Sequence, residues 1–120
     1  MLNNGTPSIS GFNLVDRKLT ALAGPARSLS GADADPAQGS FTAGGGALIA
    51  TERGTNSISS DMLDEHGYAQ APTTIESSGQ TPYGFGLTAK GPLIVSETFG
   101  GAAERRRLSR MRCLALASSR

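Results

Sequence analysis

Hydrophobic side chains recur with a helical period near the start of the chain. This stripe consists of Phe12, Val15, Leu19 and Leu22. Their spacings of three, four and three residues place them on one face of a helix. Asn13 is suited to cap the first turn, and Gly24-Pro25 is a typical helix stop. The pattern predicts an amphipathic helix over about residues 12–23.

Two interpretations of this predicted helix remain open. In one, the helix packs on its own domain. In the other, it is an anchor that lies in the groove of a partner protein, and the apolar stripe is the partner-binding surface. The rest of the chain supplies few residues to receive the helix, so the sequence does not choose between the two.

Four later segments have the composition and alternation of short strands. They are ALIATE (47–52), TTIESS (73–78), GFGLTAK (84–90) and PLIVSET (92–98). The last two are separated by Gly91, which predicts a hairpin. Ser60 can cap a turn or two of helix that ends at Gly67. The strands either pair within the chain as a small sheet or add to the sheet edge of a neighbouring chain.

The rest of the chain has no clear period. Residues 26–46 are rich in Gly, Ser and Ala and predict a linker. With the strand-like region 47–99 and a tail at 102–120, they complete one small domain or extended accessory chain over residues 1–120. The fold class expected from these elements is an irregular α+β arrangement.

The tail is rich in arginine. Residues 1–100 carry a net charge of −4 and residues 101–120 carry +5, so the tail differs from the rest in charge. A helix from Ala102 would gather the candidate anion-binding side chains Arg105, Arg106, Arg107, Arg110 and Arg112 around an apolar stripe. Three interpretations remain: docking on a protein partner, a dispensable end, or contact with nucleic acid or a membrane surface.

Composition changes this picture in one respect. Leu, Ile, Val and Phe together number 23 of 120 residues, about 19% of the chain, whereas Gly alone numbers 16. Little apolar area is therefore available to offset the backbone entropy that folding removes. A chain of this kind is expected to become ordered by packing on something else.

Little in the sequence carries catalytic or metal chemistry. Cys113 is the only cysteine and His66 the only histidine, so no disulfide forms within the chain and no zinc-type ligand set is expected. Gly84 begins a Gly-x-Gly-x-x-Ala match to the dinucleotide fingerprint, but Pro92 follows before one helical turn is complete. We expect no catalytic residue, cofactor or metal.

Two further patterns concern modification and location. Arg106-Arg107-Leu108-Ser109 resembles the substrate of a basophilic kinase, a short pattern on which the sequence alone supports no function. No run of apolar residues is long enough for a transmembrane helix, and no secretory signal is readable, so we expect a soluble chain, intracellular or within a complex.

The leading hypothesis is a non-catalytic structural or interaction protein. It would be an accessory subunit of a larger assembly, such as a virion or an organelle complex, with other protein subunits as partners. The alternative is a small domain that binds nucleic acid through its Arg-rich C-terminus. An enzyme that acts through His66 or one of the serines is a third class, for which the sequence marks no partner residues.

Overall fold

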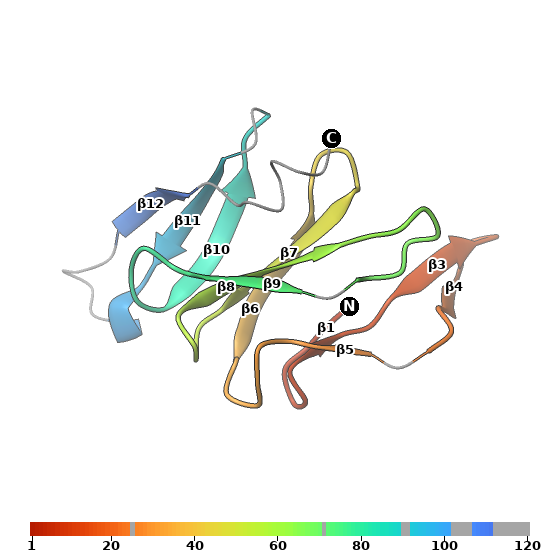
Figure 1. Cartoon of the computed structure of the whole chain (residues 1–120), viewed down its shortest axis with the longest axis horizontal. Coiled ribbons are helices and arrows are strands. Elements are labelled where there is room, and N and C mark those ends of the chain that lie inside the picture. Colours follow the sequence, from red (N-terminus) through yellow and green to blue (C-terminus); the bar gives the residue numbers. More distant parts are fainter. Residues whose placement is uncertain (25, 71, 90–91, 102–106, 112–120) are drawn as a thin grey trace.

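The structure, a computed structural model, is built almost entirely of strands (Figure 1). It describes residues 1–24, 26–70, 72–89, 92–101 and 107–111. Strands make up about half of the described residues, which contain no α-helix, only a short 3-10 turn at Phe99–Gly101. The predicted α+β class is therefore wrong, and the fold is β-rich.

The strands form three layers and a projecting hairpin (Figure 1). The central sheet contains, in spatial order, β6 (Pro36–Phe41), β7 (Ala47–Glu52), β8 (Ser57–Met62) and β9 (Thr73–Glu76). The second sheet contains β10 (Pro82–Leu87), β11 (Leu93–Glu97) and β12 (Arg107–Met111). The third contains β1 (Leu2–Asn3), β2 (Ser8–Ile9) and β5 (Arg27–Ser28). The hairpin consists of β3 (Phe12–Val15) and β4 (Lys18–Ala21). All pairings are antiparallel.

The central sheet has a core on each face, because successive side chains of a strand point to opposite sides. On one face, Ile49 of β7 and Ile58 of β8 are fully buried against Leu93 and Val95 of β11. On the other, Ala50 is buried with Ile9, Leu29 and Ala34 of the N-terminal layer. Small residues form much of this second core, so it is thin.

A β-hairpin stands where the sequence predicts the helix over residues 12–23. The opposed pairs are Phe12–Ala21, Asn13–Thr20, Leu14–Leu19 and Val15–Lys18. Asp16 and Arg17 close the turn with φ of 50° and 64°. Two consecutive left-handed residues form a type I′ turn, whose twist matches that of the flanking strands. The helix prediction is therefore wrong, because Phe12 and Leu14 before the turn and Leu19 and Ala21 after it follow the period of two of a ribbon.

The short helix predicted from Ser60 to Gly67 is also wrong. Ser60 lies within β8, and an isolated bridge joins Leu63 to Ala69. The intervening turn is organised by Asp64, whose Oδ1 accepts hydrogen bonds from the backbone N–H of His66 at 2.8 Å and of Tyr68 at 2.9 Å. An aspartate that bonds the backbone ahead of it competes with helix formation in this way.

The predicted linker over residues 26–46 is likewise wrong, since it contains β5 and β6. The strands predicted at 47–52 and 73–78 are present as β7 and β9, and β10 and β11 form the predicted hairpin, with Leu87 opposite Leu93. The predicted C-terminal helix falls mostly outside the described residues. Its described part, β12, is a strand paired with β11.

The side chain of Gln38 ties the central sheet to the second sheet. Its Nε2 donates to the Phe85 carbonyl at 2.9 Å, and its Oε1 accepts from the Phe85 N–H at 3.1 Å. Phe85 borders an irregularity in the pairing of β10 with β11. The amide of Gln38 thus satisfies both backbone groups of a residue next to that irregularity.

Gly54, in the turn between β7 and β8, is a position where glycine is required. A Cβ at this residue would lie 1.8 Å from the carbonyl oxygen of Asp33, and the Gly54 N–H donates to the Ala34 carbonyl at 3.0 Å. We expect Gly54→Ala to lower the free energy of unfolding by about 1–3 kcal/mol, because the contacted atoms belong to the backbone and cannot rotate away. Chemical denaturation measures this loss.

Gly44→Ala is the matched control for this substitution. Nothing lies within 4 Å of a Cβ at Gly44, and its φ is not in the left-handed region. The control should leave the free energy of unfolding unchanged or slightly raised. Equal stability of the two variants would contradict the close approach at Gly54.

Candidate functional site

The β3–β4 hairpin has one apolar face. Opposed residues of an antiparallel pair share a face, so Phe12, Leu14, Leu19 and Ala21 lie together. The opposite face carries Asn13, Val15, Lys18 and Thr20. All eight residues are exposed, and Leu14 and Leu19 retain 71% and 68% of their surface.

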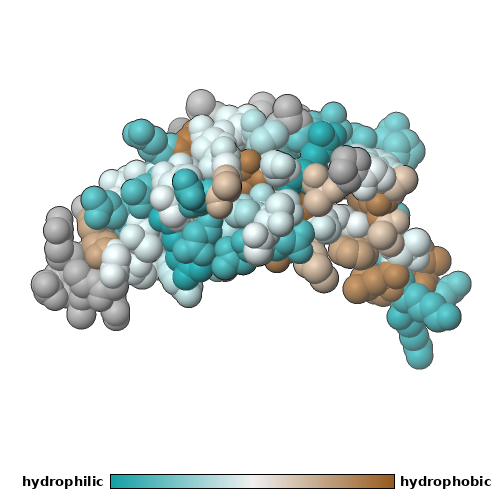
Figure 2. Space-filling view, turned by 90° about the horizontal axis from the view of Figure 1, so that it is seen from below, coloured by the Kyte–Doolittle hydropathy of each residue, from teal (hydrophilic) through white to brown (hydrophobic). Residues whose placement is uncertain are grey.

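Hydrophobic residues thus lie open at this end of the molecule. Figure 2 shows them gathered at the end that the N-terminal strands form. Contiguous exposed apolar faces are unusual on the surface of a single folded chain.

The backbone of the hairpin is also incompletely satisfied. Leu22 N donates to the Gly11 carbonyl at 3.0 Å, so Gly11 and Leu22 form a hydrogen-bonded pair. Hydrogen-bonded and non-hydrogen-bonded pairs alternate along an antiparallel ladder, so the next pair, Phe12 with Ala21, is not hydrogen-bonded. The backbone groups of the apolar residues on β3 and β4 therefore point outward. No further strand pairs with either edge among the residues that the structure describes.

The two edges of the hairpin differ in what adjoins them. Met1 exchanges two backbone hydrogen bonds with Ser10, just before β3, at 2.7 and 2.9 Å. Chain 1–10 therefore adjoins the start of β3, whereas nothing described pairs with the outer side of β4. The β4 edge is the more open one.

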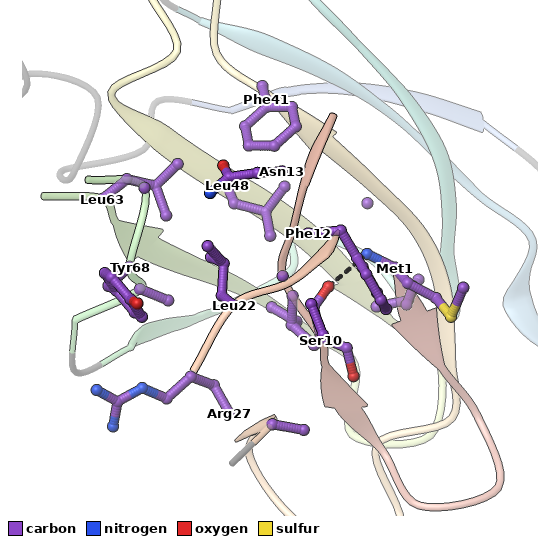
Figure 3. A pocket seen from close by; sticks show the side chains of 18 of the residues that line it. Met1, Ser10, Phe12, Asn13, Leu22, Arg27, Phe41, Leu48, Leu63 and Tyr68 are labelled. Atoms are coloured by element: carbon purple, nitrogen blue, oxygen red, sulfur yellow. Dashed lines mark hydrogen bonds between the residues drawn. The ribbon is translucent and has the colours of Figure 1, made fainter. Parts of the chain in front are cut away.

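An apolar groove of about 870 Å³ separates the hairpin from the central sheet (Figure 3). The labelled apolar side chains that line it are Met1, Phe12, Leu22, Phe41, Leu48, Leu63 and Tyr68. Arg27 supplies the one charged side chain among the described residues of its lining. Its size and lining suit the burial of apolar groups.

The structure places the four candidate partner-binding residues predicted from the sequence in three different positions. Phe12 and Leu19 share the apolar face of the hairpin, and Val15 lies on the opposite face. Leu22 follows β4 and is half-buried in the groove. The helical interpretation missed Leu14, whose alternation with Phe12 was the available signal for a strand.

The candidate anion-binding arginines fall at the edge of the described chain. Arg107 and Arg110 belong to β12, paired through the backbone with Glu97 and Ile94. Arg105, Arg106 and Arg112 lie outside the described residues. The described part of the tail is thus a strand and not the side of a basic helix.

Glu52 is a buried carboxylate that binds three segments together. At the end of β7 it accepts hydrogen bonds from the Ser30 N–H at 3.3 Å, from the Ser30 hydroxyl, from the Thr55 hydroxyl at 2.7 Å and from the Ser59 hydroxyl. Burial by itself raises the pKa of Glu52, but these hydrogen bonds outweigh it and hold the pKa below its ordinary value. The folded protein therefore favours the ionised form of Glu52.

Asp61 is a buried carboxylate of the opposite kind. It lies on β8 with 1% of its surface exposed, and neither of its oxygens accepts a hydrogen bond from a described residue. Burial raises the pKa of Asp61 to about 6, an effect that the positive charge of Arg27 moderates and the negative charge of Glu52 increases. No sequence motif marks either of these acids.

The described residues show no cluster of metal ligands. Within them, no three His, Cys, Asp or Glu side chains gather as a cation site. His66 is exposed, and its Nε2 lies 3.6 Å from the carboxylate of its neighbour Glu65. None of the helical segments in the described ranges has the length and hydropathy to span a bilayer.

Comparisons of the chain with protein-family models, curated proteins and solved structures found no match. The exposed hairpin and the groove beneath it are therefore the features of this chain from which a function can be inferred.

Proposed function

We propose that this chain is a non-catalytic structural or interaction protein that joins an assembly through its β3–β4 hairpin. The observation that carries the proposal is the exposure of a two-stranded ribbon with one apolar face and two unpaired edges. A two-stranded ribbon is marginally stable alone, and a further strand would satisfy its backbone and cover its side chains.

The added strand is β4 of a second copy of the chain. β4 has the more open edge, and antiparallel pairing would set Leu19 opposite Ala21 of the second copy, with Thr20 on the two-fold axis. In this register Lys18 faces Leu22 of the other copy, so no two like charges are opposed. The result is a four-stranded sheet with a doubled apolar face.

The proposal predicts a dimer that depends on the hairpin. We expect light scattering over a range of concentrations to show dimerisation of the wild type, and Leu19→Ser to raise the dissociation constant by at least about tenfold, since two buried leucines are lost per dimer. Leu19 is mostly exposed in the single chain, so the fold of the variant should be preserved.

Leu108→Ser is the matched control. Leu108 is 72% exposed and lies on β12, away from the hairpin. It should dimerise like the wild type. A chain that stays monomeric at every concentration, or equal weakening by both substitutions, would contradict the proposal. The nucleic-acid alternative keeps its basis in sequence alone, because most of its arginines lie outside the described residues.

A further inference from the structure

The hydroxyl of Ser109 lies against a buried carboxylate. Ser109 is opposite Val95 in the pairing of β12 with β11, so its side chain shares the inner face of that sheet with a fully buried core residue. Its Oγ donates a hydrogen bond of 2.6 Å to Oε2 of Glu97, which is completely buried and also accepts from the Ser77 hydroxyl at 3.3 Å. A phosphate on this oxygen would therefore lie directly beside the Glu97 carboxylate.

The same serine stands in a sequence that a kinase can read. Arg106 and Arg107 precede it by three and two residues, the charge pattern by which Arg-directed serine kinases select substrates. Ser109 is on an edge strand that pairs, among the described residues, with β11 alone. Edge strands with one neighbour open locally at a lower free energy than central strands, so β12 can expose Ser109 transiently.

We propose that Ser109 is a phosphorylation site and that its phosphorylation releases β12 from the sheet. An Arg-directed serine kinase with ATP would supply the group. The Ser109 oxygen bonds to the γ-phosphorus, the bond from that phosphorus to the bridging oxygen breaks, ADP leaves, and the hydroxyl proton passes to the base of the kinase.

The charge of the phosphate then determines whether β12 stays paired with β11 or detaches from it. A phosphate with a charge near −2 on the half-buried Ser109 would sit beside the fully buried carboxylate of Glu97 on the inner face of the sheet. The phosphorylated side chain is stable only outside the sheet, so the modification shifts the equilibrium toward the detached strand. The edge of β11 that β12 covered then becomes open for pairing with another strand.

The experiment uses the full chain, a purified Arg-directed serine kinase and ATP. We expect intact mass and fragment mapping to find one phosphoryl group on Ser109, and Arg106→Gln with Arg107→Gln to reduce its incorporation by at least about tenfold, with the acceptor hydroxyl retained. Hydrogen exchange of the β11 amides that face β12 should become at least about tenfold faster in the phosphorylated chain, while exchange in β7 and β8 stays unchanged.

Two variants separate charge from loss of the hydroxyl. Ser109→Ala should keep β11 protected, whereas Ser109→Glu should reproduce part of the faster exchange in every molecule without a kinase. Absence of phosphate on Ser109 in the wild type, or phosphorylation that leaves β11 as protected as before, would overturn the proposal.

Discussion

Replacing Glu52 with alanine is expected to lower the free energy of unfolding by about 3–5 kcal/mol at neutral pH. Four hydrogen bonds converge on this carboxylate from the chain at Ser30, from Thr55 in the turn and from Ser59 on β8. Removing the carboxylate leaves these N–H and O–H donors without a partner in a buried place. It also removes the hydrogen bonds that hold β7 to the three segments that carry Ser30, Thr55 and Ser59.

The loss should depend on pH, with a defined sign. The folded-state pKa of Glu52 lies below its ordinary value of 4.5, so the unfolded chain takes up this proton first as the pH falls. The stabilisation is therefore complete above pH 4.5 and is lost as the pH falls through the folded-state pKa. Glu52→Gln, which keeps the shape, should differ most from the wild type at neutral pH and progressively less in acid.

Chemical denaturation of the wild type, Glu52→Ala and Glu52→Gln across this range measures both effects. Glu76→Ala is the matched control, because Glu76 is an exposed acid on β9 of the same sheet. A Glu52→Gln variant as stable as the wild type at neutral pH would show that the carboxylate does not hold these segments.

Asp61→Asn should have the opposite dependence on pH. Burial raises the pKa of Asp61 from its ordinary 3.8 to about 6, so the folded chain holds this proton more tightly than the unfolded chain. Wild-type stability is therefore full below pH 3.8 and falls as the pH rises to about 6. The difference of two pKa units corresponds to a loss of about 3 kcal/mol.

Asparagine cannot ionise, so the variant escapes this loss. Burying the amide in the same place changes the free energy of unfolding by a fixed cost that does not depend on pH. We expect the stability of Asp61→Asn relative to the wild type to rise by about 2.4 kcal/mol between pH 4 and pH 7.5, whatever the fixed cost. Arg27, whose charge moderates the pKa of Asp61, is retained in both proteins.

Equilibrium unfolding at a series of pH values measures this change. Asp33→Asn, at an exposed position, controls for the replacement itself. A relative stability that does not vary with pH would show that the carboxylate is hydrated or paired in solution, which contradicts its burial without a hydrogen bond.

The sequence predicted strands best where apolar residues are continuous and bounded by turns. β7 and the β10–β11 hairpin were found in this way, because Ile49, Leu93 and Val95 form the core on one face of the central sheet. The N-terminal hairpin was missed because its turn, Asp16-Arg17, lacks the Asn-Gly or Asp-Gly signal of a type I′ turn. The helical spacing of Phe12, Val15, Leu19 and Leu22 then hid the alternation of Phe12 with Leu14 and of Leu19 with Ala21.

Other features left no trace in the sequence pattern. The predicted linker is ordered because Leu29 and Ala34 fill a thin layer, a role that depends on neighbours far along the chain. The polar sequence of β8 led to the prediction that Ser60 caps a helix. Only the pairing of β8 with β7 explains why Ser59 and Asp61 are buried. Of the candidate site, the sequence identified Phe12 and Leu19 but assigned them to the wrong element.

The amide of Gln38 bears on how the molecule responds to force. Sheets that touch only through apolar side chains can slide past each other, since such contacts have no preferred direction. Two directional bonds between Gln38 and the Phe85 backbone oppose that sliding. If pulling reaches this protein through β12, the load will pass through β11 and β10 into the central sheet, and the Gln38 amide will resist shear together with the hydrogen bond from the Thr51 hydroxyl of β7 to the Tyr83 carbonyl of β10.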